Sequence, residues 1–88
     1  MELWQIPPEV LGRYEKAALE GARFERLEDG SWYGEILGFP GVWTNSNNQD
    51  ACRDELREVL EEWLTLKLRD GDDDLPVVAG IDLRSIAT

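Results

Sequence analysis

Four glutamates are the first candidates for chemistry, because carboxylates on neighbouring elements can hold the metal ions of a phosphoryl-transfer enzyme. Glu25 and Glu35 fall in segments with strand periodicity, and Glu55 and Glu58 fall in a segment with helix periodicity. Two-metal chemistry requires several carboxylates that converge within a few ångströms. Strand alternation directs Glu25 and Glu35 away from the face predicted to be buried. We therefore expect these glutamates to be surface charges rather than metal ligands.

Cys52 is the one cysteine and could act as a nucleophile. A nucleophilic thiol needs an activating base, and the sequence contains no histidine. Cys52 is also spaced from Leu56 and Val59 as residues on one face of a helix are. The pattern predicts a packing role in the core. No catalytic residue is predicted, and the chain is expected not to be an enzyme.

Three aspartates at alternate positions, Asp70, Asp72 and Asp74, resemble the start of a calcium-binding loop. Such a loop requires glycine at its sixth position and a bidentate glutamate at its twelfth. Leu75 and Ile81 occupy those positions here. We therefore predict a solvated acidic turn, with no metal site and no cofactor.

Composition predicts one domain with a strongly negative charge. The 88 residues include 19 acidic and 9 basic ones, which gives a net charge of −10. Nucleic-acid binding needs clustered lysine and arginine, so this charge argues against direct binding of nucleic acid and favours a basic protein as partner. One cysteine cannot form an internal disulfide, which favours a reducing compartment. The N-terminus lacks a signal-peptide pattern and no apolar run reaches the ~20 residues of a membrane span, so we expect a cytoplasmic protein.

Several aromatic residues lie close together in the sequence and could stack on bases, as those of single-strand binders do. The charges between them are mostly negative, so the core or a protein interface is the better interpretation. Trp32 is predicted to lie in the core with Gly34 and Ile36. Tyr33, Glu35 and Trp43 are predicted to lie on the outer face of the sheet and to bind a partner.

The elements that must position these residues begin with a helix. Pro7-Pro8 is a helix-start pattern, and Gly21 is a suitable end, so residues 7–21 are predicted to be helical. Strands are predicted at residues 22–27 and 32–37, joined by a turn at Asp29-Gly30, and a short third strand at residues 42–44. Gly34, in the middle of a buried face, predicts the close approach of a helix.

A long helix is predicted over about residues 49–69, with Asn48 as its N-cap and Gly71 just beyond its end. One apolar face should pack on the sheet. From Trp63 onward, apolar residues spread around more than half of the circumference. This excess predicts self-association, as a homodimer or tetramer, through Trp63, Leu64, Leu66 and Leu68.

A final strand within residues 77–83 is predicted to lie beside the first strand. The predicted architecture is therefore α+β with the order α-β-β-β-α-β. It forms a single domain over residues 1–88, with an added helix at 1–21, a core at 22–83 and a tail at 84–88. The role of the added helix stays open between covering a sheet edge and joining an oligomer contact.

The middle of the chain resembles the HicB family of bacterial antitoxins. The matching residues are Tyr-Gly-Glu-Ile at 33–36, Phe-Pro-Gly-Val-Trp at 39–43 and the helix at 51–64. The similarity extends over roughly residues 14–83. It implies part of an RNase H fold, in a family regarded as having lost nuclease activity. It also implies a partner of the HicA type, a small basic RNA-cleaving toxin.

The chain differs from the usual HicB pattern at some positions. Ser46 stands where a loop glycine is usual, Ala51 where glutamate is common and Glu55 where asparagine is common. Only about twenty residues follow the long helix, too few for the DNA-binding module that many HicB antitoxins carry. Repression of its own operon by this chain alone is therefore not expected.

Two functions follow from these observations. The first is a HicB-like antitoxin domain that neutralises a HicA-type toxin by protein–protein occlusion, without a DNA-binding module of its own. The alternative is an orphan oligomeric domain that binds a protein or a small ligand and has no toxin partner. A toxin gene beside this one would favour the first, and a gene standing alone would favour the second.

Overall fold

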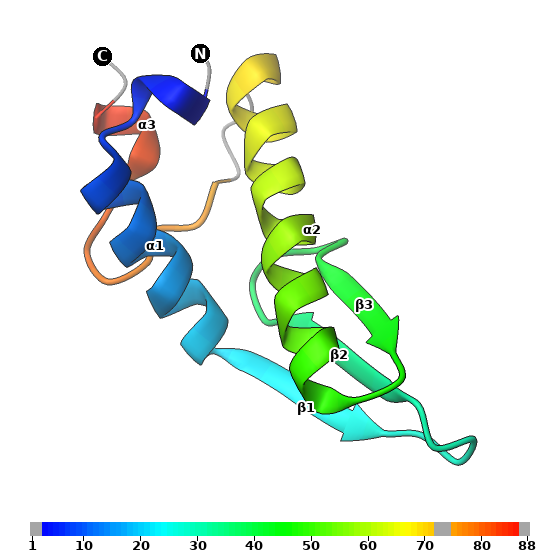
Figure 1. Cartoon of the computed structure of the whole chain (residues 1–88). Helices are drawn as coiled ribbons and strands as arrows, with labels where there is room; N and C mark the ends of the chain where they lie inside the picture. The colour runs from blue at the N-terminus through cyan, green and yellow to red at the C-terminus, as the bar shows by residue number, and fades with distance from the viewer. Residues whose placement is uncertain (1–2, 72–74, 87–88) are drawn as a thin grey trace.

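The computed structural model describes residues 3–71 and 75–86 and has the predicted α+β architecture (Figure 1). A short 3-10 helix precedes the predicted first helix, and the elements then follow the predicted order as far as the end of the long helix. In chain order they are η1 (Leu3–Gln5), α1 (Pro8–Glu20), β1 (Ala22–Arg26), β2 (Trp32–Ile36), β3 (Trp43–Ser46), α2 (Gln49–Asp70) and α3 (Leu83–Ile86).

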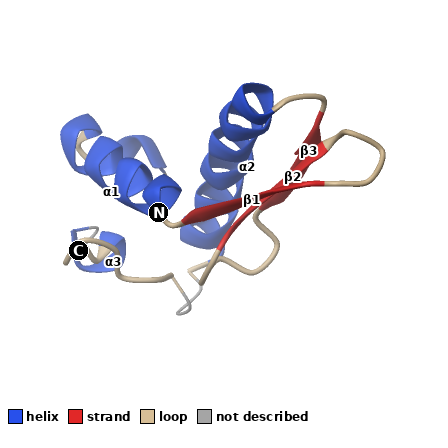
Figure 2. Cartoon of the chain, turned by 90° about the horizontal axis from the view of Figure 1, so that it is seen from below, coloured by secondary structure: helices blue, strands red, loops and turns tan. Residues whose placement is uncertain are grey.

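The sheet is an antiparallel meander in the order β1-β2-β3, as predicted. Phe24 of β1 pairs with Gly34 of β2, and Gly34 pairs in turn with Thr44 of β3. Gly30 has a φ of 86° in the turn between β1 and β2, a conformation that glycine adopts without steric conflict. Helix α2 lies along one face of the sheet, packed against β2 and β3 (Figure 2). Among the described elements, none covers the other face.

Helix α2 begins and ends at the predicted signals. The side-chain Oδ1 of Asn48 accepts a hydrogen bond from the backbone N–H of Ala51 at 2.8 Å, and Gly71 ends the helix in the left-handed conformation with a φ of 69°. Within the described ranges, no helix is both long and apolar enough to cross a membrane. The buried residues of α2 recur at every fourth position: Cys52, Leu56, Leu60, Leu64 and Leu68.

This buried stripe winds around α2, because residues four apart are about 400° apart on the helix, roughly 40° more than one turn. The N-terminal part of the stripe therefore faces the sheet, and the C-terminal part turns toward other elements. In Figure 1 the lower half of α2 lies against β2 and β3, and its upper half lies beside η1 and the start of α1. Helix α2 thus packs in two layers: its N-terminal half packs on the sheet, and its C-terminal half packs on the elements at the other end of the molecule.

The prediction that Leu64 and Leu68 form a self-association surface is wrong, because both side chains are buried within the single chain. Their exposed fractions are 0% and 3% in the single chain. The elements that cover them come from the N-terminal and C-terminal segments rather than from a second copy, since Ile6, Leu75 and Leu83 belong to the same buried cluster. The excess of apolar residues is real, but most of it is satisfied within the chain.

The predicted final strand at residues 77–83 is wrong. Val78 and Ile81 instead form an isolated bridge that closes a tight turn, with N···O distances of 2.8 and 3.2 Å. Ala79 and Gly80 between them have φ values of 52° and 74°, which no extended strand contains. The short helix α3 follows, and Figure 1 shows it beside the N-terminal elements rather than beside β1.

Helix α1 packs on α2 and anchors this C-terminal segment. Tyr14 is fully buried, and its hydroxyl donates a hydrogen bond to the carbonyl of Pro76 at 2.6 Å. Its ring meets the ring of Phe39 edge-on, with centroids 6.2 Å apart. Burial raises the pKa of Tyr14 to about 12, so the phenol keeps its proton and its donor role at neutral pH. The added helix is therefore part of the core.

Candidate protein-binding surface

The uncovered face of the sheet brings together the three residues predicted to bind a partner. Glu35 of β2 pairs with Trp43 of β3, and Tyr33 lies two residues along β2 on the same face. The rings of Tyr33 and Trp43 stack at an interplanar angle of 28°, with centroids 6.1 Å apart. The Tyr33 hydroxyl donates to the Glu35 carboxylate at 3.0 Å. We call these residues and the neighbouring exposed Leu37 the aromatic surface.

The aromatic surface presents apolar area on a strongly acidic chain. Trp43 and Leu37 are 55% and 57% exposed. A depression of about 340 Å³ extends from Tyr33 and Trp43 across the turn between β2 and β3. Gly41 lies in this turn with a φ of 92°, and the turn is fixed from below because the indole N–H of Trp63 donates to the carbonyl of Pro40 at 3.0 Å. A hydrogen bond thus ties the turn beside the aromatic surface to α2.

Charged side chains from β1 complete the surface. Arg23 pairs with Glu35 and Glu25 pairs with Tyr33 in the sheet register. The hydrogen bond to Glu35 raises the pKa of Tyr33, because the phenolate would lose its donor and repel the carboxylate. Aromatic faces beside carboxylates match the chemistry of an arginine or lysine side chain.

The opposite face of the sheet meets α2 at very short range. A Cβ atom on Gly34 would lie 2.9 Å from the sulfur of Cys52 and 3.0 Å from the ring of Phe24. The predicted close approach of a helix at Gly34 is therefore confirmed. Burial raises the pKa of Cys52, so its thiol stays protonated and packs as a core residue, as predicted. The prediction that Trp32 lies in the core is wrong, because Trp32 is only half-buried and does not belong to the buried cluster or to the residues packed against it.

Alanine at Gly34 should lower the free energy of unfolding by about 2 kcal/mol, because overpacking a closed core typically costs about 1–3 kcal/mol. Denaturant unfolding followed by tryptophan fluorescence measures the change. Gly12→Ala is the matched control, since a Cβ on this glycine in α1 would meet no atom within 4 Å. The control should stabilise the protein by up to about 1 kcal/mol. A stabilising Gly34→Ala would contradict the tight packing of α2.

The four glutamates considered for metal binding do not come together. Glu25 and Glu35 lie on the uncovered face of the sheet, whereas Glu55 of α2 accepts hydrogen bonds from Thr44, at 3.0 Å, and Ser46 on the covered face. These bonds lower the pKa of Glu55. Across residues 3–71 and 75–86, no group of three or more histidine, cysteine, aspartate or glutamate side chains could hold a metal ion. Of the three aspartates in the predicted acidic turn, Asp70 ends α2, and the other two lie outside the described residues.

The remaining residues predicted for self-association lie on α2. Trp63 is half-buried against Phe39, with ring centroids 5.3 Å apart, and the ammonium group of Lys67 lies 5.2 Å from its ring. Leu66 is 55% exposed, in a depression that Glu58 and two further glutamates line. A symmetric contact between two such patches would bring like charges together. Self-association through Leu66 stays a prediction.

A buried carboxyl group between α1 and α2 was not predicted. Glu15 is 4% exposed, and its Oε2 lies 3.6 Å from the Nε of Arg57. The sequence offered one sign of it, because Glu15 adjoins Tyr14 and lies three and four residues from Ala18 and Leu19 on the apolar side of α1. The charged side chain alone suggested exposure.

Comparison with known proteins identifies the family. The profile of the UPF0150-like family matches residues 13–76, from within α1 to just beyond α2. A search of curated proteins gives no match. Among solved structures, TTHA0281 from Thermus thermophilus is similar, with 36% sequence identity and a TM-score of 0.68 over 74% of this chain and 82% of that one. The chain belongs to the UPF0150-like family.

Proposed function

We propose that this domain is a HicB-like antitoxin, which binds a basic RNA-cleaving toxin of the HicA type and blocks it by occlusion. The UPF0150-like family is related to the HicB-like proteins of toxin–antitoxin systems. The observation that carries the proposal is the aromatic surface, where Tyr33, Glu35 and Trp43 lie together on the uncovered face of the sheet. Occlusion needs no reacting group, only a surface that stays in place.

Charge supports a basic partner. The net charge of −10 attracts a cationic protein and speeds its encounter with the domain. At the surface itself, an arginine of the partner could stack on Trp43 while its guanidinium pairs with Glu35. Aromatic anchors of this kind carry much of the affinity in protein interfaces. A toxin surface that normally meets RNA phosphates would then be covered by carboxylates and rings.

Replacing Trp43 by alanine should weaken toxin binding by about thirtyfold, since loss of an aromatic anchor costs about 2 kcal/mol. Isothermal titration calorimetry with a purified HicA-type toxin measures the affinity. The matched control is Trp4→Ala, because Trp4 is 79% exposed on η1, at the end of the molecule away from the sheet (Figure 1). The control should bind as the unchanged protein does.

Growth rescue tests the same proposal in cells. The domain should relieve the growth arrest that the toxin causes, and Trp43→Ala should relieve it less. The absence of both a complex and growth rescue would reject the antitoxin role. Equal loss of affinity in Trp4→Ala and Trp43→Ala would instead reject the aromatic surface as the binding site.

One observation favours the alternative, a domain that binds a small ligand. A pocket lies between α1 and α2, away from the aromatic surface, and it contains the buried Glu15. A ligand in this pocket would not need a toxin partner to bind.

A further inference from the structure

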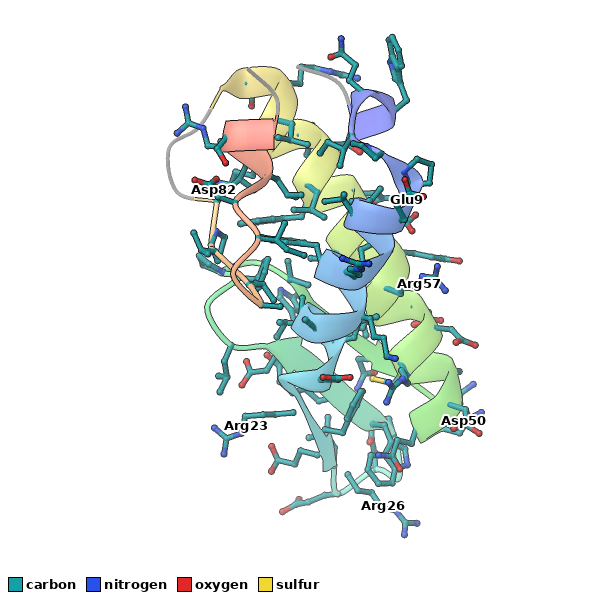
Figure 3. The ribbon with its side chains drawn as sticks, turned by 90° about the vertical axis from the view of Figure 1, so that its left-hand side faces the viewer. Glu9, Arg23, Arg26, Asp50, Arg57 and Asp82 are labelled. Atoms are coloured by element: carbon teal, nitrogen blue, oxygen red, sulfur yellow. The ribbon has the colours of Figure 1, made fainter. Side chains whose placement is uncertain are left out.

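Positive charge gathers in one pocket of this acidic protein. The pocket lies between α1 and the N-terminal half of α2 and has a volume of about 260 Å³. Lys16, Arg53 and Arg57 line it, three of the nine basic residues in the chain. Figure 3 shows Arg57 on the side of α2 that adjoins α1. A concentration of cations that runs against a net charge of −10 indicates an anionic ligand.

Glu15 lies in the same lining and lacks a partner for one oxygen. Its Oε1 is buried and has no hydrogen-bond partner in the described part of the chain. Its Oε2 lies 3.6 Å from the Nε of Arg57, which lies 3.8 Å from the carboxylate of Glu61. A buried polar atom without a partner costs about 1–3 kcal/mol. A ligand atom that bonds to Glu15 would remove this cost.

The protonation of Glu15 decides which ligand atom suits it. Burial, followed by the charge of the nearby Glu61 carboxylate and a side-chain hydrogen bond to it, raises the pKa of Glu15 to about 7 against the opposing effect of Arg57. Near neutral pH much of Glu15 is therefore a neutral carboxylic acid, whose O–H is a donor. With Glu15 neutral, Asp54 is the one carboxylate among the described lining residues, against three cations.

We propose that this pocket binds a small oxyanion, a carboxylate or a tetrahedral phosphate-like group, held by Lys16, Arg53 and Arg57 and by a hydrogen bond with the buried carboxyl group of Glu15. Among residues 3–71 and 75–86, neither Lys16 nor Arg53 has an ion-pair partner, and both ion pairs of Arg57 use its Nε. The pocket is thus lined by two cations without an ion-pair partner, Lys16 and Arg53, and by the carboxyl group of Glu15. Its volume is roughly nine times the ~30 Å³ share of one water molecule, so the ligand is small.

Nuclear magnetic resonance on the full ¹⁵N-labelled chain tests the site, with sodium acetate and sodium sulfate as probes. The two anions separate a carboxylate from a tetrahedral ligand, and both remain ionised between about pH 6 and about pH 8. The amide signals of Gly12 and Arg53, which line the pocket, should shift and saturate with at least one anion near pH 6. Sodium chloride controls for ionic strength, and methylammonium chloride controls for binding of a cation.

The pH dependence has a defined sign. The bound form requires the proton on Glu15, so the affinity should fall by about tenfold from about pH 6 to about pH 8, because roughly one tenth of Glu15 is protonated one unit above a pKa of about 7. Glu15→Gln keeps a neutral donor at this position. This variant should bind the anion with the same affinity at both pH values.

Arg53→Gln should weaken anion binding by about tenfold, the lower end of the effect of a hydrogen bond to a charged group. Arg26→Gln makes the same charge change on β1, far from Arg57 in Figure 3, and should leave the affinity unchanged. Shifts that never saturate, or equal effects of the two arginine variants, would overturn the proposal. Binding of methylammonium instead of the anions, or anion binding independent of pH in the unchanged protein, would overturn it as well.

Discussion

Alanine in place of Leu64 should lower the free energy of unfolding by about 3 kcal/mol, whereas alanine in place of Leu66 should change it by less than about 0.5 kcal/mol. The two positions are two residues apart on α2 and carry the same side chain. Leu64 is fully buried in the core, whereas Leu66 is 55% exposed. Truncation at Leu64 therefore leaves a cavity, and truncation at Leu66 leaves only water where a side chain was.

Urea unfolding of the two variants, followed by tryptophan fluorescence, gives both values from one type of experiment. The shared substitution removes helix propensity as an explanation, since leucine and alanine differ little in it. Equal losses at both positions would mean that the exposed side of α2 is covered in solution, which is the result expected if Leu66 joins a self-association contact. A small loss at Leu64 would contradict the second packing layer.

Glutamine in place of Glu15 should stabilise the protein above about pH 7 and have little effect near pH 4.5. The folded-state pKa of Glu15 is about 7, raised by burial and by Glu61 from an ordinary 4.5. Below pH 4.5 the carboxyl is neutral in both the folded and the unfolded state, so burial carries no charge penalty. As pH rises to about 7, the unfolded chain ionises first and the folded state loses relative stability. One pKa unit corresponds to about 1.36 kcal/mol, so the loss is on the order of 3 kcal/mol.

The difference in unfolding free energy between the unchanged protein and Glu15→Gln isolates this effect, because the other titrating groups are common to both. The difference should grow between about pH 4.5 and about pH 7 and remain level at higher pH. Glu58→Gln is a control for the loss of one negative charge, since the exposed Glu58 is solvated in both states. A difference that is constant with pH would show that Glu15 is not buried as an acid.

Local signals determined most of the secondary structure. Asn48 and Gly71 set the ends of α2 because a cap depends on hydrogen bonds within a few residues. The Asp29-Gly30 turn and the alternation along β2 placed Tyr33 and Glu35 on one face, and the short return strand added Trp43. The candidate protein-binding surface was therefore predictable, because its three residues are close in sequence and the sheet register follows from the turns.

Contacts between distant segments decided the rest. The residues at 77–83 are apolar enough for a strand, but Ala79 and Gly80 turn the chain back, and the hydrogen bond from Tyr14 to Pro76 joins residues 62 positions apart. The sequence pattern around Tyr14 does not indicate that it contacts the segment around Pro76, and the pattern around Pro76 does not indicate it either. The same holds for the winding stripe of α2, since periodicity shows that Leu64 and Leu68 are apolar but not which element covers them.

The sequence by itself determined helices α1 and α2, the meander, the acidic charge and the grouping of Tyr33, Glu35 and Trp43. Only the tertiary structure decided that Leu64 and Leu68 are internal and that Glu15 is buried beside Arg57 and Glu61. The physical reason is range: hydrogen bonds of caps and turns act over a few residues, whereas burial and the pKa of Glu15 depend on side chains that α2 brings from some forty residues away.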